Sequence, residues 1–163
     1  MPRKPRYEEA GAIHHVYARG VNRRKLFEND FDRSTYLSTL AQVVRGWRWQ
    51  CFTYCLMDNH VHLLVRTAEP NLGSGMQRLH SLYAQGFNER HGRLGHLFQG
   101  RYGSSRVRTA AQGRYLLGYI DANPVNAGMC AAPHDWPWGG CAARRSGRVP
   151  GWLCAEDLLE GLL

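Results

Sequence analysis

Residues Tyr54–Arg66 read Tyr-Cys-Leu-Met-Asp-Asn-His-Val-His-Leu-Leu-Val-Arg and contain two histidines, His60 and His62, separated by one residue. The second half of this stretch is rich in valine and leucine and predicts a buried strand over residues 60–67. Alternate side chains of a strand share a face, so His60 and His62 point the same way while Val61 points into the core. Two neutral imidazoles on one rigid face form half of a divalent-metal site. Because a His-x-His pair also arises by chance, the rest of the chain must supply the other half.

A hairpin presents this pair. Residues 47–56 predict a strand by composition, and residues 57–59 form a connection of hairpin length. Asp58 and Asn59 suit the turn. His60 is therefore expected at the start of its strand, near the edge of the sheet and within reach of a substrate.

Periodicity predicts five further elements: strands at 13–19 and 104–108, and helices from near residue 30 to 46, from 72 to 90 and from 110 to about 122. Asp30 or Asp32 can cap the first helix and Thr109 the third, which Pro124 should end. The resulting order is the βαββαβ plan of ferredoxin-like (RRM-like) α+β folds. That plan makes the first and third strands central neighbours in an antiparallel sheet, with two helices on one face and an extra helix after the last strand.

Length and pattern predict one domain of 163 residues. Residues 1–10 are expected to form a flexible basic arm, residues 11–124 the core that carries the histidine pair, and residues 125–163 a tail packed on that core. Trp136 and Trp138 should attach the tail, and residues 152–163 should form a short amphipathic helix.

The composition favours a nucleic-acid partner. Lys and Arg number 21 against 13 acidic residues, and this net charge of +8 suits a polyanion better than a neutral partner. No apolar run approaches the ~20 residues of a membrane span, and no apolar stretch follows the basic N-terminus as in a signal peptide. We therefore expect a cytoplasmic protein. The five cysteines are scattered and lack zinc-knuckle spacing, so we interpret them as reduced thiols.

The segment 92–108 combines four glycines up to residue 103 with arginines beside aromatic residues. Arginines and stackable aromatics on a flexible backbone are typical of single-stranded nucleic-acid binding. The competing interpretation is a solvated loop with Phe98 and Tyr102 tucked beneath it, in which His96, Gln99 and Arg101 only shape the loop. The candidate DNA contacts are Arg23, Arg24, His96, Gln99, Arg101, Tyr102, Arg106 and Arg108.

Helical spacing places Tyr115, Tyr119 and Asn123 on one face of the third helix. This helix follows the last strand and could cross near His60 and His62. His15, on the first strand, is either a packing histidine or a neighbour of the His60 and His62 pair, and its role stays open.

Four blocks together resemble the REP-associated tyrosine transposases, within the single-tyrosine HUH transposases. They are His15-Val-Tyr-Ala-Arg-Gly, Leu56-Met-Asp-Asn-His-Val-His-Leu-Leu, Gly95-His-Leu-Phe-Gln-Gly-Arg-Tyr and Tyr119-Ile-Asp-Ala-Asn-Pro-Val. The resemblance implies that His60, His62 and Asn123 hold one divalent ion, Mg²⁺ or Mn²⁺. It implies that Tyr119 attacks single-stranded DNA at REP-like hairpins through a 5′-phosphotyrosine, in a monomer rather than a dimer. Tyr115 is the rival nucleophile on the same helix face, and Tyr119 is the better candidate because its spacing to Asn123 puts both side chains at one end of the helix. The tail is shorter than in many relatives, which leaves target choice open.

The residues fit that chemistry. Attack on a phosphodiester needs an aligned nucleophile and a cation that offsets charge on the phosphoryl oxygens. A tyrosine, with an ordinary pKa near 10, must lose its proton as it attacks. Two alternatives remain: a non-catalytic RRM-like module that binds single-stranded DNA or RNA hairpins, and a relative that has lost catalysis. An RRM-like module would need aromatic residues in specific strand motifs, which this chain does not have. A relative that has lost catalysis would not need to keep all three catalytic residues, yet all three are present.

Overall fold

The computed structural model describes residues 6–163. Its strands are β1 (Ile13–Arg19), β2 (Trp49–Leu56), β3 (His60–Thr67) and β4 (Gly103–Val107). Its α-helices are α1 (Asp30–Gly46), α2 (Leu72–His91), α3 (Ala110–Asn126), α4 (Gly140–Arg145) and α5 (Asp157–Glu160), and its 3₁₀-helices are η1 (Val21–Arg23) and η2 (Pro133–Asp135). The four strands form one antiparallel sheet in the order β2-β3-β1-β4. The predicted α+β plan, with β1 and β3 at the centre, is confirmed.

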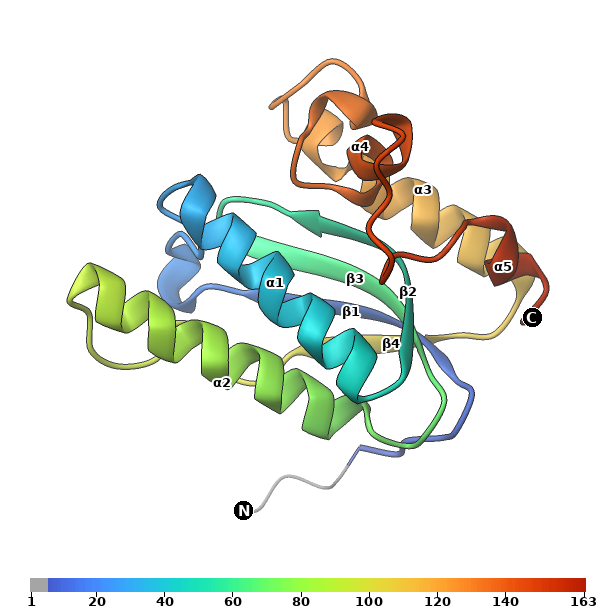
Figure 1. Ribbon diagram of the computed structural model, residues 1–163, viewed down its shortest axis with the longest axis horizontal. Coiled ribbons are helices and arrows are strands. Elements are labelled where there is room, and N and C mark those ends of the chain that lie inside the picture. The colour runs from blue at the N-terminus through green and yellow to red at the C-terminus, as the bar shows by residue number, and fades with distance from the viewer. Residues whose placement is uncertain (1–5) are drawn as a thin grey trace.

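The sheet separates two layers of helices. Figure 1 shows α1 and α2 on one face and α3 and α5 on the other, whereas α4 lies beside the edge strand β2. The strands alternate accordingly: Val61 and Leu63 of β3 belong to the core beneath α1 and α2, whereas Leu64 belongs to a second core with Ile120 of α3. His60 and His62 share the face of Leu64, so the alternation turns them toward α3.

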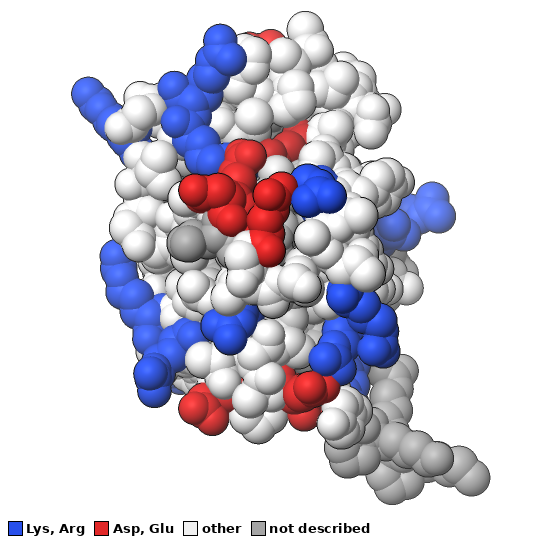
Figure 2. Space-filling model, turned by 90° about the vertical axis from the view of Figure 1, so that its right-hand side faces the viewer, with Lys and Arg blue, Asp and Glu red and all other residues white. Residues whose placement is uncertain are grey.

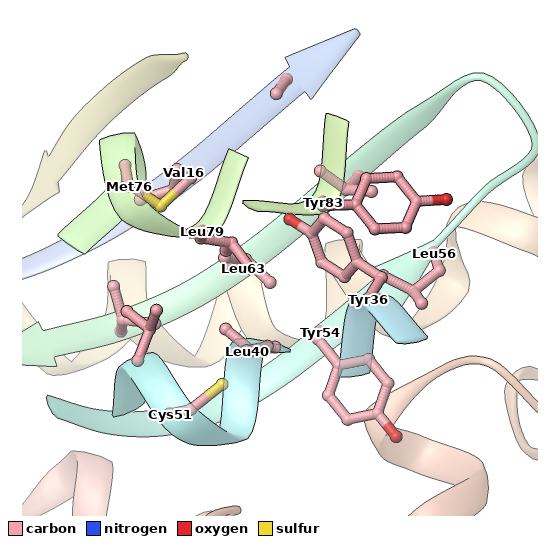
Figure 3. Packing of buried hydrophobic residues seen from close by; sticks show 14 of the residues in the cluster. Val16, Tyr36, Leu40, Cys51, Tyr54, Leu56, Leu63, Met76, Leu79 and Tyr83 are labelled. Carbon is pink, nitrogen blue, oxygen red and sulfur yellow. The ribbon is translucent and has the colours of Figure 1, made fainter. Parts of the chain in front are cut away.

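The larger core explains the rigidity of this scaffold. Figure 3 shows Leu63 of β3 and Val16 of β1 beside Met76 and Leu79 of α2, with Leu40 of α1 nearby. All five side chains are almost fully buried. Burying one such side chain contributes about 1.5–3 kcal/mol, so both central strands are held firmly from the α1 and α2 side.

The first helix begins differently from the prediction. Its N-cap is Asn29, whose side chain accepts a hydrogen bond from the Asp32 amide at 3.0 Å. Asp32 is instead fully buried and accepts hydrogen bonds from Arg90 and His91 of α2. The expectation that Asp30 or Asp32 caps this helix was therefore wrong, because α2 supplies Asp32 with partners that the local sequence does not show. The Thr109 cap of α3 is confirmed by a bond from the Gln112 amide.

The third helix continues through Pro124 to Asn126, so the predicted end near residue 122 was wrong. A proline lacks the amide proton of an ordinary helical bond, yet this one lies in the last turn, where little of the helix remains to be disrupted. Pro124 is also buried, and the Ala127 amide still bonds to the Asn123 carbonyl at 3.0 Å. Packing thus compensates for the missing donor and keeps Asn123 in helical geometry.

Both ends of the chain also differ from expectation. Residues 1–5 of the predicted arm lie outside the described residues, but Arg6 stacks over the Tyr102 ring and Glu8 accepts from the Gly73 amide, so residues 6–10 are attached to the domain. The expected helix over 152–163 shrinks to the four residues of α5. The tail still packs as predicted, since the Trp136 indole donates to the Leu56 carbonyl.

All five cysteines are free thiols, as predicted. Within residues 6–163, no helix is long and apolar enough to cross a membrane.

Candidate active site

The two histidines of β3 meet on the α3 face of the sheet. Their ring centroids lie 5.2 Å apart with the planes nearly perpendicular. His62 is 9% exposed and His60 is half-buried. The strand alternation therefore produces the predicted pair of imidazoles at a surface that opens toward solvent.

The neighbouring turn determines the orientation of the His60 ring. The Asn59 amide group donates to the Arg23 carbonyl at 3.3 Å, which turns the Asn59 Oδ1 toward His60 Nδ1 at 2.7 Å. An amide oxygen only accepts, and this contact is shorter than the one between the other ring nitrogen and Asn123 Oδ1, so Nδ1 of a neutral His60 carries the proton. The other nitrogen, Nε2, then directs a lone pair at Asn123 Oδ1, 3.3 Å away.

The His62 ring is held by β1. His62 Nδ1 lies 2.9 Å from His15 Nε2, and the two rings stack with centroids 5.2 Å apart and planes 21° apart. His15 is thus a direct neighbour of the pair rather than a packing histidine only. This contact leaves Nε2 of His62 as the nitrogen open to a ligand.

Burial keeps all three rings uncharged near neutral pH. It lowers the pKa of His15 and is the main cause that lowers the pKa of His60. For His62, burial and then the neighbouring His15 and His60 lower the pKa to about 3. Neutral imidazoles are the form that binds a metal ion.

Tyr119 of α3 faces the histidines. Its ring centroid lies 6.1 Å from that of His62 and 6.2 Å from that of His15, and its side chain is 40% exposed. Tyr115 stacks on Tyr119 at 6.3 Å on the side away from the pair and is 68% exposed. Both distances from Tyr119 join residues of one chain, so the candidate nucleophile and the candidate metal ligands need no second subunit to meet.

A buried ion pair attaches α3 to the sheet and to the tail. Asp121 accepts from the Thr53 hydroxyl at 2.5 Å and pairs with Arg144 of α4 at 2.6 Å. Arg144 also donates to the Phe52 carbonyl and pairs with Glu156. Because Asp121 lies between Tyr119 and Asn123 in the sequence, this network positions the helix that carries both.

The donor atoms fit a divalent ion. Neutral His60 Nε2 and Asn123 Oδ1 are both acceptors, and two lone pairs facing each other at 3.3 Å are stabilised when a cation lies between them. His62 adds a second imidazole 5.2 Å from the first. Among residues 6–163 there is no group of three or more His, Cys, Asp or Glu side chains arranged for a metal. The candidate donor set differs from such a group, since an amide oxygen would be its third donor.

The candidate DNA contacts do not gather in one place. Arg23, Arg24 and Gln99 are exposed, and the Gln99 amide bonds to the Arg19 carbonyl at the end of β1. These three residues lie at the end of the sheet where Asn59 bonds to the Arg23 carbonyl. They therefore border the histidine pair.

The other candidates lie farther round the molecule. His96 and Arg101 line a groove of about 840 Å³ beside α2, and Arg106 and Arg108 line a smaller one of about 470 Å³ along β4. Arg106 is already paired with Glu9. Figure 2 shows, on one face, a compact group of acidic side chains lying between separate groups of Lys and Arg. The positive charge is therefore divided into patches.

The expectation that Phe98 and Tyr102 stack on bases was wrong. Each is 8% exposed, so the competing interpretation of tucked aromatics holds. Phe98 packs on the ring of His80 with centroids 3.9 Å apart, and Tyr102 lies beneath Arg6. Their apolar faces contribute to the core because the loop folds back on α2.

Two residues near the site received no role from the sequence. Asn59 was interpreted only as a turn residue, although it orients His60. Arg19 of β1 lies opposite His60 of β3 in the sheet register. Its positive charge contributes to the lowered pKa of both His60 and His62. The alternation of β1 could have identified Arg19, since it follows His15 and Tyr17 on the same face.

The comparisons agree with this geometry. A family model described as Transposase IS200-like matches residues 10–123. None of the curated proteins matches the chain. Among solved structures, one described as a REP-associated tyrosine transposase bound to a REP hairpin is similar, with a TM-score of 0.73 and 18% sequence identity. The alignment covers 95% of this chain and 92% of that chain.

At that identity the structural likeness shows the fold, whereas the family match spans most of the chain and includes the histidine pair, Tyr119 and Asn123. The chain belongs to the IS200-like transposase family, whose members act on DNA.

Proposed function

We propose that this transposase cleaves and rejoins single-stranded DNA beside a hairpin, with Tyr119 as the nucleophile. The observation that carries the proposal is the 6.1 Å separation of the Tyr119 and His62 rings within one chain, with Asn123 contacting His60 one helical turn farther on. A nucleophile and three metal-ligand side chains thus converge on one face of the sheet.

The proposed reaction exchanges one phosphoester bond for another. The Tyr119 oxygen attacks the phosphorus atom, the bond from phosphorus to the 3′-oxygen breaks, and the 3′-oxygen leaves with a proton. The DNA is left as a 5′-phosphotyrosine. The Tyr119 side chain is 40% exposed, so its own proton can pass to water. Because one phosphoester replaces another, the reverse reaction rejoins strands without ATP.

His60, His62 and Asn123 would hold a single Mg²⁺ or Mn²⁺. When bound, the ion offsets the negative charge that develops on the phosphoryl oxygens. Arg19, opposite His60 in the sheet, adds a fixed positive charge beside the same position.

The proposed DNA partner rests on two supports. The structurally similar transposase is described as bound to a REP hairpin, and this chain carries a net charge of +8 with exposed Arg23 and Arg24 beside the site. We propose that the protein acts as a monomer, since the rings of Tyr119 and His62 lie 6.1 Å apart within one chain. As an enzyme that acts on DNA, it is proposed to work in the cytoplasm.

The test uses an oligonucleotide with a hairpin flanked by single strands, incubated with Mg²⁺ or Mn²⁺ and resolved on a denaturing gel. Wild-type protein and Tyr115→Phe should form a covalent protein–DNA adduct, whereas Tyr119→Phe should form none, because a phenylalanine ring offers no attacking oxygen. Tyr115→Phe is a matched control, since it removes the same atom one turn earlier on the same helix face.

An adduct that survives in Tyr119→Phe but disappears in Tyr115→Phe would transfer the nucleophilic role to Tyr115. Hairpin binding without cleavage or adduct on any substrate would favour the non-catalytic binding module instead.

A further inference from the structure

The two histidines of β3 share a feature that the metal-ligand motif does not require: in each ring, Nδ1 is occupied by a neighbouring side chain. Asn59 Oδ1 lies 2.7 Å from His60 Nδ1, and His15 Nε2 lies 2.9 Å from His62 Nδ1. In a neutral imidazole one nitrogen carries the proton and the other carries the lone pair, so the partner of Nδ1 decides which nitrogen can bind a cation.

Asn59 can hold only one tautomer of His60. Its amide nitrogen already donates to the Arg23 carbonyl, so its oxygen must face the ring. Asn59 Oδ1 and Asn123 Oδ1 both only accept, so they compete for the one proton of a neutral ring, and the shorter contact, 2.7 Å to Asn59, favours the proton on Nδ1 and the lone pair on Nε2. Nε2 is the atom that lies 3.3 Å from Asn123 Oδ1.

His15 can hold the matching tautomer of His62. The contact joins two ring nitrogens, of which one must donate and the other accept. If His62 binds a cation through Nε2, its Nδ1 donates, and His15 accepts through Nε2 and carries its own proton on Nδ1. The stacked rings, with planes 21° apart, also restrict rotation of His62.

We propose that Asn59 and His15 are positioning residues that hold His60 and His62 as Nδ1–H tautomers, so that both Nε2 lone pairs are available to one cation. The inference rests on the proposed metal site and deepens it. Partners of this kind increase ligand basicity and fix ring orientation, and their removal typically weakens metal affinity about 10–100-fold.

The first measurement needs no metal. Long-range proton–nitrogen NMR correlations of the metal-free protein report the tautomer of each imidazole. His15, His60 and His62 should all carry the proton on Nδ1. In His15→Phe, His62 should lose this preference while His60 keeps it, and Asn59→Leu should have the converse effect. Finding Nε2–H on His60 or His62 in the wild-type protein would overturn the proposal, because that proton blocks the cation.

The second measurement is the Mn²⁺ affinity without DNA, followed by electron paramagnetic resonance. His15→Phe and Asn59→Leu should each weaken binding about 10–100-fold. His15→Gln and Asn59→Asp keep an accepting oxygen and should recover most of the affinity. Tyr17→Phe is the matched control: Tyr17 lies on the same face of β1, its ring is 5.4 Å from that of His15, and the change removes only a hydroxyl.

The outcomes separate this inference from the proposed function. Unchanged Mn²⁺ affinity in both His15→Phe and Asn59→Leu would show that neither residue positions a ligand, even if the wild type cleaves DNA. The wild-type protein could instead bind no Mn²⁺ while His15, His60 and His62 all carry the proton on Nδ1. That result would support the positioning roles of Asn59 and His15 and would contradict the proposed metal-dependent reaction.

Discussion

The ring of His80 lies between α2 and the loop that follows it, stacked on Phe98 with centroids 3.9 Å apart. Its Nε2 is 3.3 Å from the hydroxyl of Tyr36, which is fully buried. Burial lowers the pKa of His80 to about 3, so this side chain is neutral in the folded protein over most of the accessible pH range. A protonated ring here would lack a compensating anion among the contacts just described.

This burial predicts a pH-dependent stability. The unfolded chain protonates His80 near pH 6.5, but the folded chain does so only near pH 3. Between these values the unfolded state binds more protons, so stability is complete above pH 6.5 and is lost as the pH falls, by up to about 1.4 kcal/mol per pH unit.

Urea denaturation of wild type and His80→Gln from pH 7 to pH 4 tests this expectation, since glutamine keeps a polar partner for Tyr36 without titrating. The variant should show a shallower loss of stability than the wild type. Parallel curves would mean that His80 is not the group responsible.

Among the elements, helix α3 is held against the sheet and α4 by polar contacts of Asp121, near its middle, as well as by its apolar side. Asp121 and Arg144 are 10% and 15% exposed, and their ion pair joins α3 to α4 while Thr53 joins it to β2. Burial raises the pKa of Asp121, although Thr53 and Arg144 oppose this effect. Removing one partner of such a pair leaves a buried charge uncompensated, which is more costly than removing both.

We therefore expect Arg144→Ala to lower the free energy of unfolding by about 3 kcal/mol and to speed amide hydrogen exchange in residues 110–126. The adduct yield from Tyr119 should fall with it, because the nucleophile is no longer held near His62. Arg145→Ala is the control, since the adjacent side chain is exposed. Equal effects of the two substitutions would argue against the Asp121 pair as the attachment of α3.

Across the whole molecule, the site combines side chains from three separate parts of one chain. His15 comes from β1, His60 and His62 from β3, and Tyr119 and Asn123 from α3. The rings of Tyr119 and His62 approach within 6.1 Å without a second subunit. This arrangement makes a definite prediction about complementation between inactive variants.

A mixture of Tyr119→Phe and His60→Ala should remain inactive in DNA cleavage, because each molecule lacks one half of its own site. Light scattering with size-exclusion chromatography should give the mass of a single chain. A mixture of wild type with either variant serves as the positive control. Restored cleavage in the mixture of the two variants would demonstrate a site shared between subunits and would contradict the in-chain geometry.

Much of the fold was predictable because it depends on short-range periodicity. The alternation in residues 13–19 and 60–67 correctly placed His60 and His62 on one face, and helical spacing put Tyr119 and Asn123 on one face of a single helix. The predictions that failed each depended on distant contacts. Asn29 is the cap, while Asp32 accepts hydrogen bonds from Arg90 and His91 of α2, and α3 continues through Pro124, which is buried.

The amino-acid sequence was sufficient to predict which side chains share a face, because backbone geometry alone sets the periods of strands and helices. Three further features became visible only in the folded protein: α3 crosses the face opposite α1 and α2, His15 contacts His62 across 47 positions of sequence, and His60 contacts Asn123 across 63. Such contacts depend on how complete elements pack and on the buried Asp121–Arg144 pair, and no local pattern encodes them.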